Sequence, residues 1–133
     1  MKIRSISNLR IPENLLKILE EEEYWEDESF EPIMITVEEI QYQGEDMISY
    51  QVDFGVLEEY KDINGDEWEE LIRFYIEKKE PEIIKFIQGD SERSTCVIWT
   101  NSESSFKKIL GWMIELINSE DEVKKVLEKK ASR

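Results

Sequence analysis

Few side chains in this sequence could act as catalytic groups. Histidine is absent, and the single cysteine, Cys96, has no histidine to activate it. The commonest general base, the triads built on histidine and most zinc sites are therefore excluded. A lone thiol is a poor nucleophile candidate, and none of the five glycines forms a phosphate-binding loop. We therefore expect no catalytic residue, no bound cofactor and no enzymatic activity.

The turn at residues 62–66 has the superficial pattern of a calcium loop, with oxygen-bearing side chains at alternate positions. A calcium loop of the EF-hand type requires glycine at its sixth position and glutamate at its twelfth. Here the glycine falls at the fourth position, as Gly65, and Arg73 occupies the twelfth. A turn followed by a helix cap explains the same residues, so we predict no metal site.

Carboxylates are the most abundant reactive groups, with 32 Asp and Glu against 17 Lys and Arg and a formal net charge of −15. In so acidic a chain, pairs of carboxylates arise by chance, and the sequence selects no acid–base pair among them, although a carboxylate enzyme stays open as an alternative. The charge repels nucleic-acid phosphates and anionic lipids, and it attracts basic proteins. We therefore predict a basic protein partner and no direct binding of nucleic acid or membrane.

The strongest candidate for a binding site is an acidic segment (residues 20–31), in which 8 of 12 positions are acidic and none is basic. We expect its carboxylates to steer a basic partner and its large aromatic residues to anchor that partner. The alternative is a solvated acidic loop in which Trp25 folds back onto the core. The predicted partner-binding residues are Glu20, Glu21, Glu22, Glu23, Tyr24, Trp25, Glu26, Asp27, Glu28 and Phe30.

Three absences bear on the cellular compartment. One cysteine cannot form an intrachain disulfide, no apolar run approaches the length of a membrane span, and no apolar stretch follows the first basic residues. These features predict a cytoplasmic protein.

The residues around the acidic segment predict a helix and a hairpin. The helix starts at Pro12, a residue suited to the first helical position, and like charges should end it within the acidic segment. Strands are expected at residues 33–42 and 47–57, joined by a turn at 43–46, because the second strand alternates apolar and polar side chains. We expect the first strand at the sheet edge, where Glu38 and Glu39 would oppose self-pairing.

The second half of the chain predicts three helices and a buried strand. Asp66 with Glu69 should cap a helix that ends before Pro81, and a turn at 88–91 precedes an apolar strand at 95–99. A long helix follows from a cap at Ser102 to Asn118. A final helix opens at Ser119, with Val123, Val126 and Leu127 on its buried face.

Helices packed on a small antiparallel sheet make an α+β fold, and 133 residues suit a single domain. The four tryptophans divide into Trp68 and Trp99 in the core, a partly exposed Trp112, and Trp25 in the acidic segment. The expected core residues are Val52, Phe54, Trp68, Leu71, Ile72, Tyr75, Val97, Trp99, Phe106, Ile109, Leu110, Met113 and Leu116.

Ordered motifs in the second half resemble a known family. They are Asn-Gly-Asp-Glu-Trp-Glu-Glu-Leu at 64–71, Lys-Glu-Pro-Glu-Ile at 79–83, Gly-Asp-Ser-Glu-Arg at 89–93, Cys-Val-Ile-Trp at 96–99, and the start of the long helix at 101–106. Together they resemble immunity protein family fifty-one of bacterial polymorphic-toxin systems. We expect residues 47–131 to form the family-like part of one domain (residues 1–133) and residues 1–46 to form a variable N-terminal part.

The resemblance implies that the protein binds and neutralises a cognate toxin domain by occlusion, without catalysis, and it supplies no site residues. The net charge favours a nuclease toxin, because nucleases carry basic clefts for phosphates. The alternative is an acidic regulatory or adaptor module that binds another basic protein by imitating a nucleic acid. We expect a monomer or a weak dimer.

Overall fold

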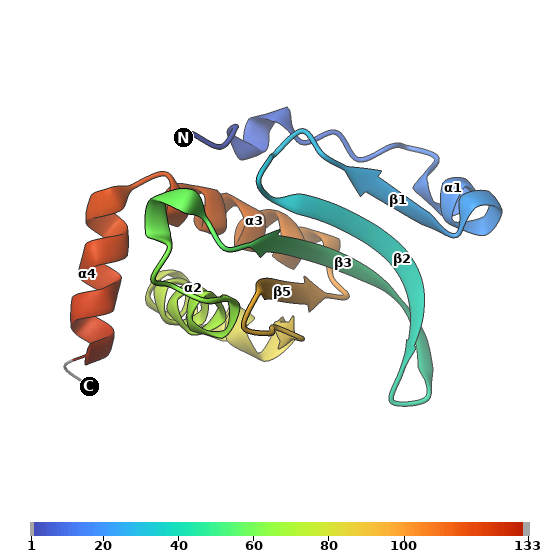
Figure 1. Cartoon of the computed structure of the whole chain (residues 1–133). Helices are drawn as coiled ribbons and strands as arrows, with labels where there is room; N and C mark the ends of the chain where they lie inside the picture. The colour runs from blue at the N-terminus through green and yellow to red at the C-terminus, as the bar shows by residue number, and fades with distance from the viewer. Residues whose placement is uncertain (1, 132–133) are drawn as a thin grey trace.

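A five-stranded antiparallel sheet forms the centre of the computed structural model, which describes residues 2–131 (Figure 1). The spatial order of the strands is β1-β2-β3-β5-β4. Their bounds are β1 (Tyr24–Asp27), β2 (Met34–Tyr42), β3 (Glu45–Gly55), β4 (Gln88–Gly89) and β5 (Thr95–Thr100).

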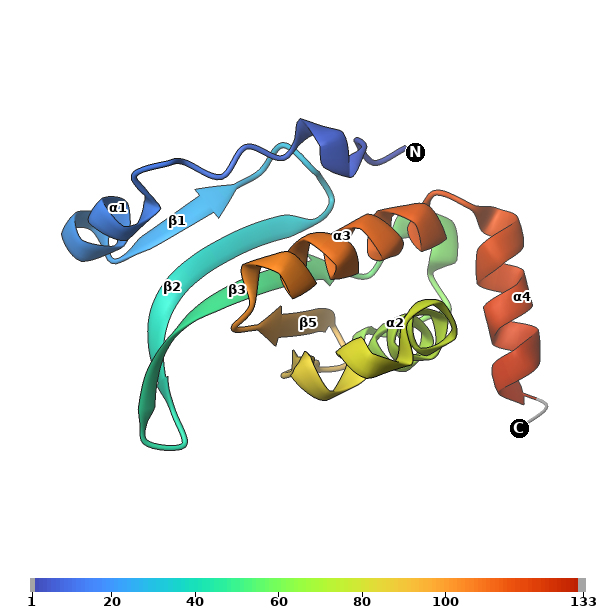
Figure 2. The same ribbon diagram turned by 180° about the vertical axis from the view of Figure 1, so that it is seen from behind.

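Four α-helices accompany the sheet in the described part of the chain: α1 (Leu15–Glu22), α2 (Gly65–Lys79), α3 (Glu103–Ile117) and α4 (Glu120–Ala131). Short 3₁₀ helices lie at Ile6–Asn8, Glu58–Tyr60 and Pro81–Phe86. Figure 2 shows α3 and α2 in front of β3 and β5, with α4 packed beside them and α1 at the far end of the sheet. The predicted α+β fold, with an antiparallel sheet packed against several helices, is confirmed.

Side chains at even positions of β3 face the helices. Tyr50 stacks on Phe106 of α3 with 5.5 Å between the ring centroids, and Phe54 meets Trp68 of α2 at 5.8 Å. Residues at odd positions of β3 therefore point to the opposite face, which we call the open face. The predicted core residues are buried except Val97, which is half-buried because it pairs with Asp53 on the open face.

The N-terminal third differs from the prediction in two respects. Helix α1 begins at Leu15 and continues through Glu22, ending where Glu23 adopts a left-handed φ of 75° and donates its backbone N–H to the carbonyl of Leu19. The acidic segment then forms β1, a strand that the sequence did not predict. Because β1 pairs with β2, the expected edge strand at 33–42 is an interior strand, and β1 is the edge.

Smaller differences occur in the second half. Asn64 and Glu67 form the capping box of α2, where Asp66 and Glu69 were expected. Part of the turn predicted at 88–91 is the short strand β4, which pairs with β5. Leu127 is 40% exposed, since only Val123 and Val126 of α4 face the core. The cap at Ser102 is confirmed.

The β2–β3 hairpin extends beyond its neighbouring strands. Its two-residue turn places Gln43 and Gly44 at positive φ values of 52° and 83°, the backbone that favours tight hairpins. β1 reaches β2 only as far as Glu38, and β5 reaches β3 only from Tyr50. Residues 39–49 therefore form a two-stranded arm that projects from the sheet (Figure 1).

Candidate functional site

The acidic segment occupies one end of the molecule, formed by the last turn of α1 and the edge strand β1 (Figure 2). Glu20, Glu21 and Glu22 are exposed residues of the helix, and Glu23 ends it. The C-terminal turn of a helix carries a partial negative charge, so carboxylates there are unfavourable for the helix. No basic residue lies in that turn of α1 to offset the repulsion.

The strand part of the acidic segment divides its side chains between the two faces of the sheet. Tyr24 pairs with Glu38 and Glu26 pairs with Thr36, so both point to the open face, where Tyr24 is 49% exposed. Asp27 points to the other face, and its carboxylate accepts hydrogen bonds from the backbone N–H and the hydroxyl of Ser29 at 2.8 and 2.6 Å. Asp27 thus shapes the turn that follows the strand.

The aromatic residues of the acidic segment lie in three different environments. Trp25 is half-buried and packs against the hydrophobic core, as in the alternative in which it folds back onto the core. Phe30 is fully buried, so its side chain is a core residue and not the surface contact that was expected. The reason is the tight turn after β1, which directs Phe30 beneath the sheet before β2 begins. Tyr24 is the aromatic side chain that the acidic segment presents to solvent.

The carboxylates of the acidic segment differ in their pairing from six carboxylates of α2, α3 and α4. Within residues 2–131, all of the salt bridges lie between residues 69 and 130, on and around the helices. Examples are Glu69 with Arg73 at 3.1 Å and Glu70 with Lys130 at 2.7 Å. No carboxylate of the acidic segment forms a salt bridge among these residues. The acidic segment is therefore a contiguous stretch of carboxylates whose negative charge is free to act on a partner.

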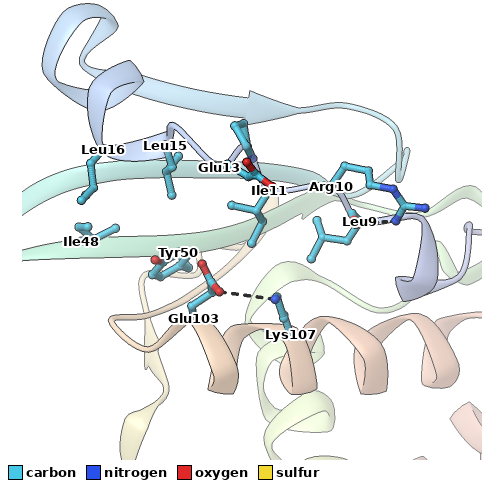
Figure 3. Close-up of a pocket in the computed structure, with 11 residues that line it drawn as sticks. Leu9, Arg10, Ile11, Glu13, Leu15, Leu16, Ile48, Tyr50, Glu103 and Lys107 are labelled. Atoms are coloured by element: carbon cyan, nitrogen blue, oxygen red, sulfur yellow. Dashed lines mark hydrogen bonds and ion pairs between the residues drawn. The ribbon is translucent and has the colours of Figure 1, made fainter.

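A groove of about 610 Å³ adjoins the acidic segment on the helix-covered face (Figure 3). Leu15 and Leu16 of α1 form one wall, while Ile48 and Tyr50 of β3 and the start of α3 form the other. Leu16 is 64% exposed, the most exposed of the large apolar side chains. The charged residues around the groove are of both signs: Arg10, Glu13, and a Glu103–Lys107 pair at 3.5 Å.

A family model described as Immunity protein 51 matches residues 33–132. The chain belongs to this family. The match covers β2 to α4 and leaves the acidic segment outside it. No characterised protein and no solved structure matches the chain significantly. Membership of an immunity protein family indicates that the chain neutralises a toxin.

Cys96 supplies the single thiol of this immunity protein. Cys96 is buried, and burial raises the pKa of its thiol from 9.0 to about 12, so the thiol is protonated at neutral pH. Residues 2–131 contain no group of three or more Asp, Glu and Cys side chains placed to hold a metal ion. None of the helices formed by these residues combines the length and the apolar character that crossing a bilayer requires.

A second cluster of residues, on the open face of the sheet, was not predicted from the sequence. Tyr42 at the far end of β2 contacts Trp99 of β5, with 5.0 Å between the ring centroids. The alternation of β2 places Glu38 and Tyr42 on one face and could have grouped these two residues in advance. It could not have brought Tyr42 to Trp99, because that contact depends on the bend of the arm.

Proposed function

We propose that this protein binds a cognate bacterial toxin domain in the cytoplasm and neutralises it by occlusion, with the acidic segment as a major part of the interface. The observation that carries the proposal is that the carboxylates of this segment have no basic partner within residues 2–131, whereas six carboxylates of α2, α3 and α4 form salt bridges. Unpaired exposed carboxylates produce a field that attracts a basic surface.

The position of the carboxylates on α1 adds a second argument. Glu20, Glu21 and Glu22 repel one another and the negative end of the helix, so they reduce the stability of α1. Binding to a basic partner would relieve this repulsion. Recognition of a basic partner would therefore explain why the protein keeps three glutamates that reduce the stability of α1.

Neutralisation by occlusion requires the immunity protein to cover a surface that the toxin needs for its activity. Acidic side chains would speed the encounter with a basic active-site cleft, and contacts at the exposed ring of Tyr24 would slow dissociation. A nuclease fits this description best, because its cleft is basic in order to bind phosphates. The acidic segment would then occupy positions that the nucleic acid otherwise takes.

The test is co-expression with a toxin domain. The gene should lie directly downstream of one that encodes a large secreted protein with a variable C-terminal toxin domain. Expression of that domain alone should stop growth, and co-expression with this protein should restore it. A matched pair of variants refines the test: Glu20, Glu21 and Glu22 all changed to Gln, against Glu58→Gln, Asp62→Asn and Glu128→Gln at exposed sites elsewhere.

Rescue by the wild type and by the second variant, with weaker rescue by the first, would support the proposal. Absence of rescue by the wild type would overturn the toxin assignment and favour an adaptor that binds another basic protein. Equal rescue by the wild type and both variants would retain toxin neutralisation and remove the acidic segment from the interface.

A further inference from the structure

The open face of the sheet contains a pocket of about 300 Å³ under the bent β2–β3 arm. We infer that this pocket binds an arginine side chain of the partner, an inference that rests on the proposed function. The pocket is distinct from the groove in Figure 3, which lies on the opposite, helix-covered face.

The bend of the arm creates the pocket. Tyr42 is paired with Glu45 near the hairpin tip, whereas Trp99 is paired with Gln51 two strands away from β2. The two rings nevertheless meet edge to face, at an interplanar angle of 87°, and the Tyr42 hydroxyl donates a hydrogen bond to Oε1 of Gln88 at 3.3 Å. The arm therefore curls across the open face and is held there by Tyr42.

The residues that line the pocket have a consistent chemistry. Two carboxylates, Glu38 and Asp90, stand on its opposite sides, on β2 and just after β4. Tyr42 and Trp99 supply aromatic surface, and glutamine side chains supply carbonyl oxygens. No lysine or arginine lines the pocket. Such a lining attracts a cation and offers it both hydrogen-bond acceptors and a π surface.

Glu38 is the central residue of this argument. Its side chain is half-buried, yet within residues 2–131 its carboxylate has no hydrogen bond and no ion pair. A partly buried carboxylate without a partner is unfavourable, and a cationic hydrogen-bond donor would satisfy it. A guanidinium group suits the site better than an ammonium group, because it is planar, donates in parallel to a carboxylate and stacks on aromatic rings.

The position of the pocket joins it to the acidic segment. Tyr24 of β1 lies directly opposite Glu38 of β2, and both point to the open face. A basic partner that covers Tyr24 would thus reach the pocket from the same side. By contrast, the groove in Figure 3 carries Arg10 and Lys107 among its lining residues, so it offers no comparable preference for a cation.

The first experiment tests the pocket without a toxin. N-acetylarginine amide is titrated into the ¹⁵N-labelled protein and followed by NMR, with N-acetylcitrulline amide as the uncharged analogue of the same shape. The variants are Glu38→Gln with Asp90→Asn, and Glu128→Gln with Asp62→Asn as a control that removes the same charge at exposed sites elsewhere. Each substitution keeps the size of the side chain, so both variants should fold.

We expect saturable shifts of the Trp99 indole N–H and the Gln88 side-chain amide with the arginine compound. These shifts should persist in the control variant and disappear in the pocket variant and with the citrulline compound. Their absence in the wild type, or equal shifts with citrulline or in the pocket variant, would overturn the inference.

The second experiment measures the dissociation constant for the toxin domain encoded upstream. The pocket variant should bind at least about tenfold more weakly than the wild type, because an unpaired cation would be left in the interface, and the control variant should bind within about twofold. Equal affinities of the two variants, with growth rescue intact, would remove the pocket from the interface and leave the proposed function standing. Failure of the wild type to bind the toxin would contradict the proposed function itself.

Discussion

Trp25 of β1 lies directly opposite Val37 of β2, and this pairing turns the indole toward the helix-covered face of the sheet. Val37 is fully buried, and Trp25 packs against the same core. The next residue toward the N-terminus, Tyr24, therefore faces the open side. Two adjacent aromatic residues in the acidic segment thus have opposite surroundings, and substitutions should separate their roles.

Trp25→Ala should lower the free energy of unfolding by about 1–3 kcal/mol, less than for a fully buried tryptophan, because the side chain is half-buried. Urea denaturation of the wild type and the variant measures this difference. An unchanged free energy of unfolding together with weakened toxin binding would instead make Trp25 the aromatic anchor of the interface.

Tyr24→Ala should have the reverse effect. Its ring is 49% exposed, so the melting temperature should change little, while toxin binding should weaken by at least about 1 kcal/mol if the ring is covered in the complex. Calorimetric titration of the toxin domain measures the second quantity. Wild-type affinity in a stably folded Tyr24→Ala variant would remove this residue from the interface.

The sequence was sufficient for the elements whose pattern is strong. The stripe from Phe106 to Leu116 in α3 and the alternation of β3 predicted both the elements and their buried faces. It was insufficient for β1, because four residues of acids and aromatics carry no strand pattern and form a strand only by pairing with β2. The pocket at Tyr42 and Trp99 also lay beyond sequence reasoning, since it depends on the curvature of the arm.

Gly65→Ala should lower the free energy of unfolding by at least about 1–3 kcal/mol. A Cβ atom at this position would collide with the backbone carbonyl oxygens of Glu92 and Thr95, and neither is the end of a flexible side chain. Gly65 also donates its N–H to the carbonyl of Arg93 at 2.8 Å, which fixes the start of α2 against this loop. The close approach explains physically why glycine follows Asn64 here.

Gly55→Ala is the matched control for this prediction. A Cβ atom on Gly55 would lie 3.7 Å from the carbonyl oxygen of Ser94, an ordinary contact distance. Thermal unfolding of the two variants should therefore show a large loss at position 65 and a small change at position 55. Similar melting temperatures would contradict the packing argument.

Cys96 should make the protein less stable at alkaline pH. Burial raises the pKa of the folded-state thiol from 9.0 to about 12, so between these values the unfolded chain loses a proton that the folded chain keeps. This contribution to stability is complete below pH 9 and is lost as the pH rises towards 12. Cys96→Ser should lose less stability over that range than the wild type, as measured by urea denaturation. A thiol reagent should also modify native Cys96 much more slowly than the unfolded chain.

Changing Glu20, Glu21 and Glu22 together to Gln should stabilise the isolated protein and weaken its interaction with the toxin. The stabilisation, about 0.3 kcal/mol or more in total, follows from removing like charges from the negative end of α1. The weakening should occur mainly in the association rate and should shrink as salt is added, because these carboxylates act at long range. Stopped-flow association kinetics at several ionic strengths, with urea denaturation in parallel, measures both effects.

The control changes Glu58, Asp62 and Glu128 to their amides, which alters the net charge by the same amount at exposed sites outside the acidic segment. If steering depends on where the carboxylates stand, the control should associate nearly as fast as the wild type. Equal slowing in both variants would mean that net charge alone drives the encounter. A slower association confined to the α1 variant, together with its higher stability, would show that these three glutamates serve binding at the expense of folding.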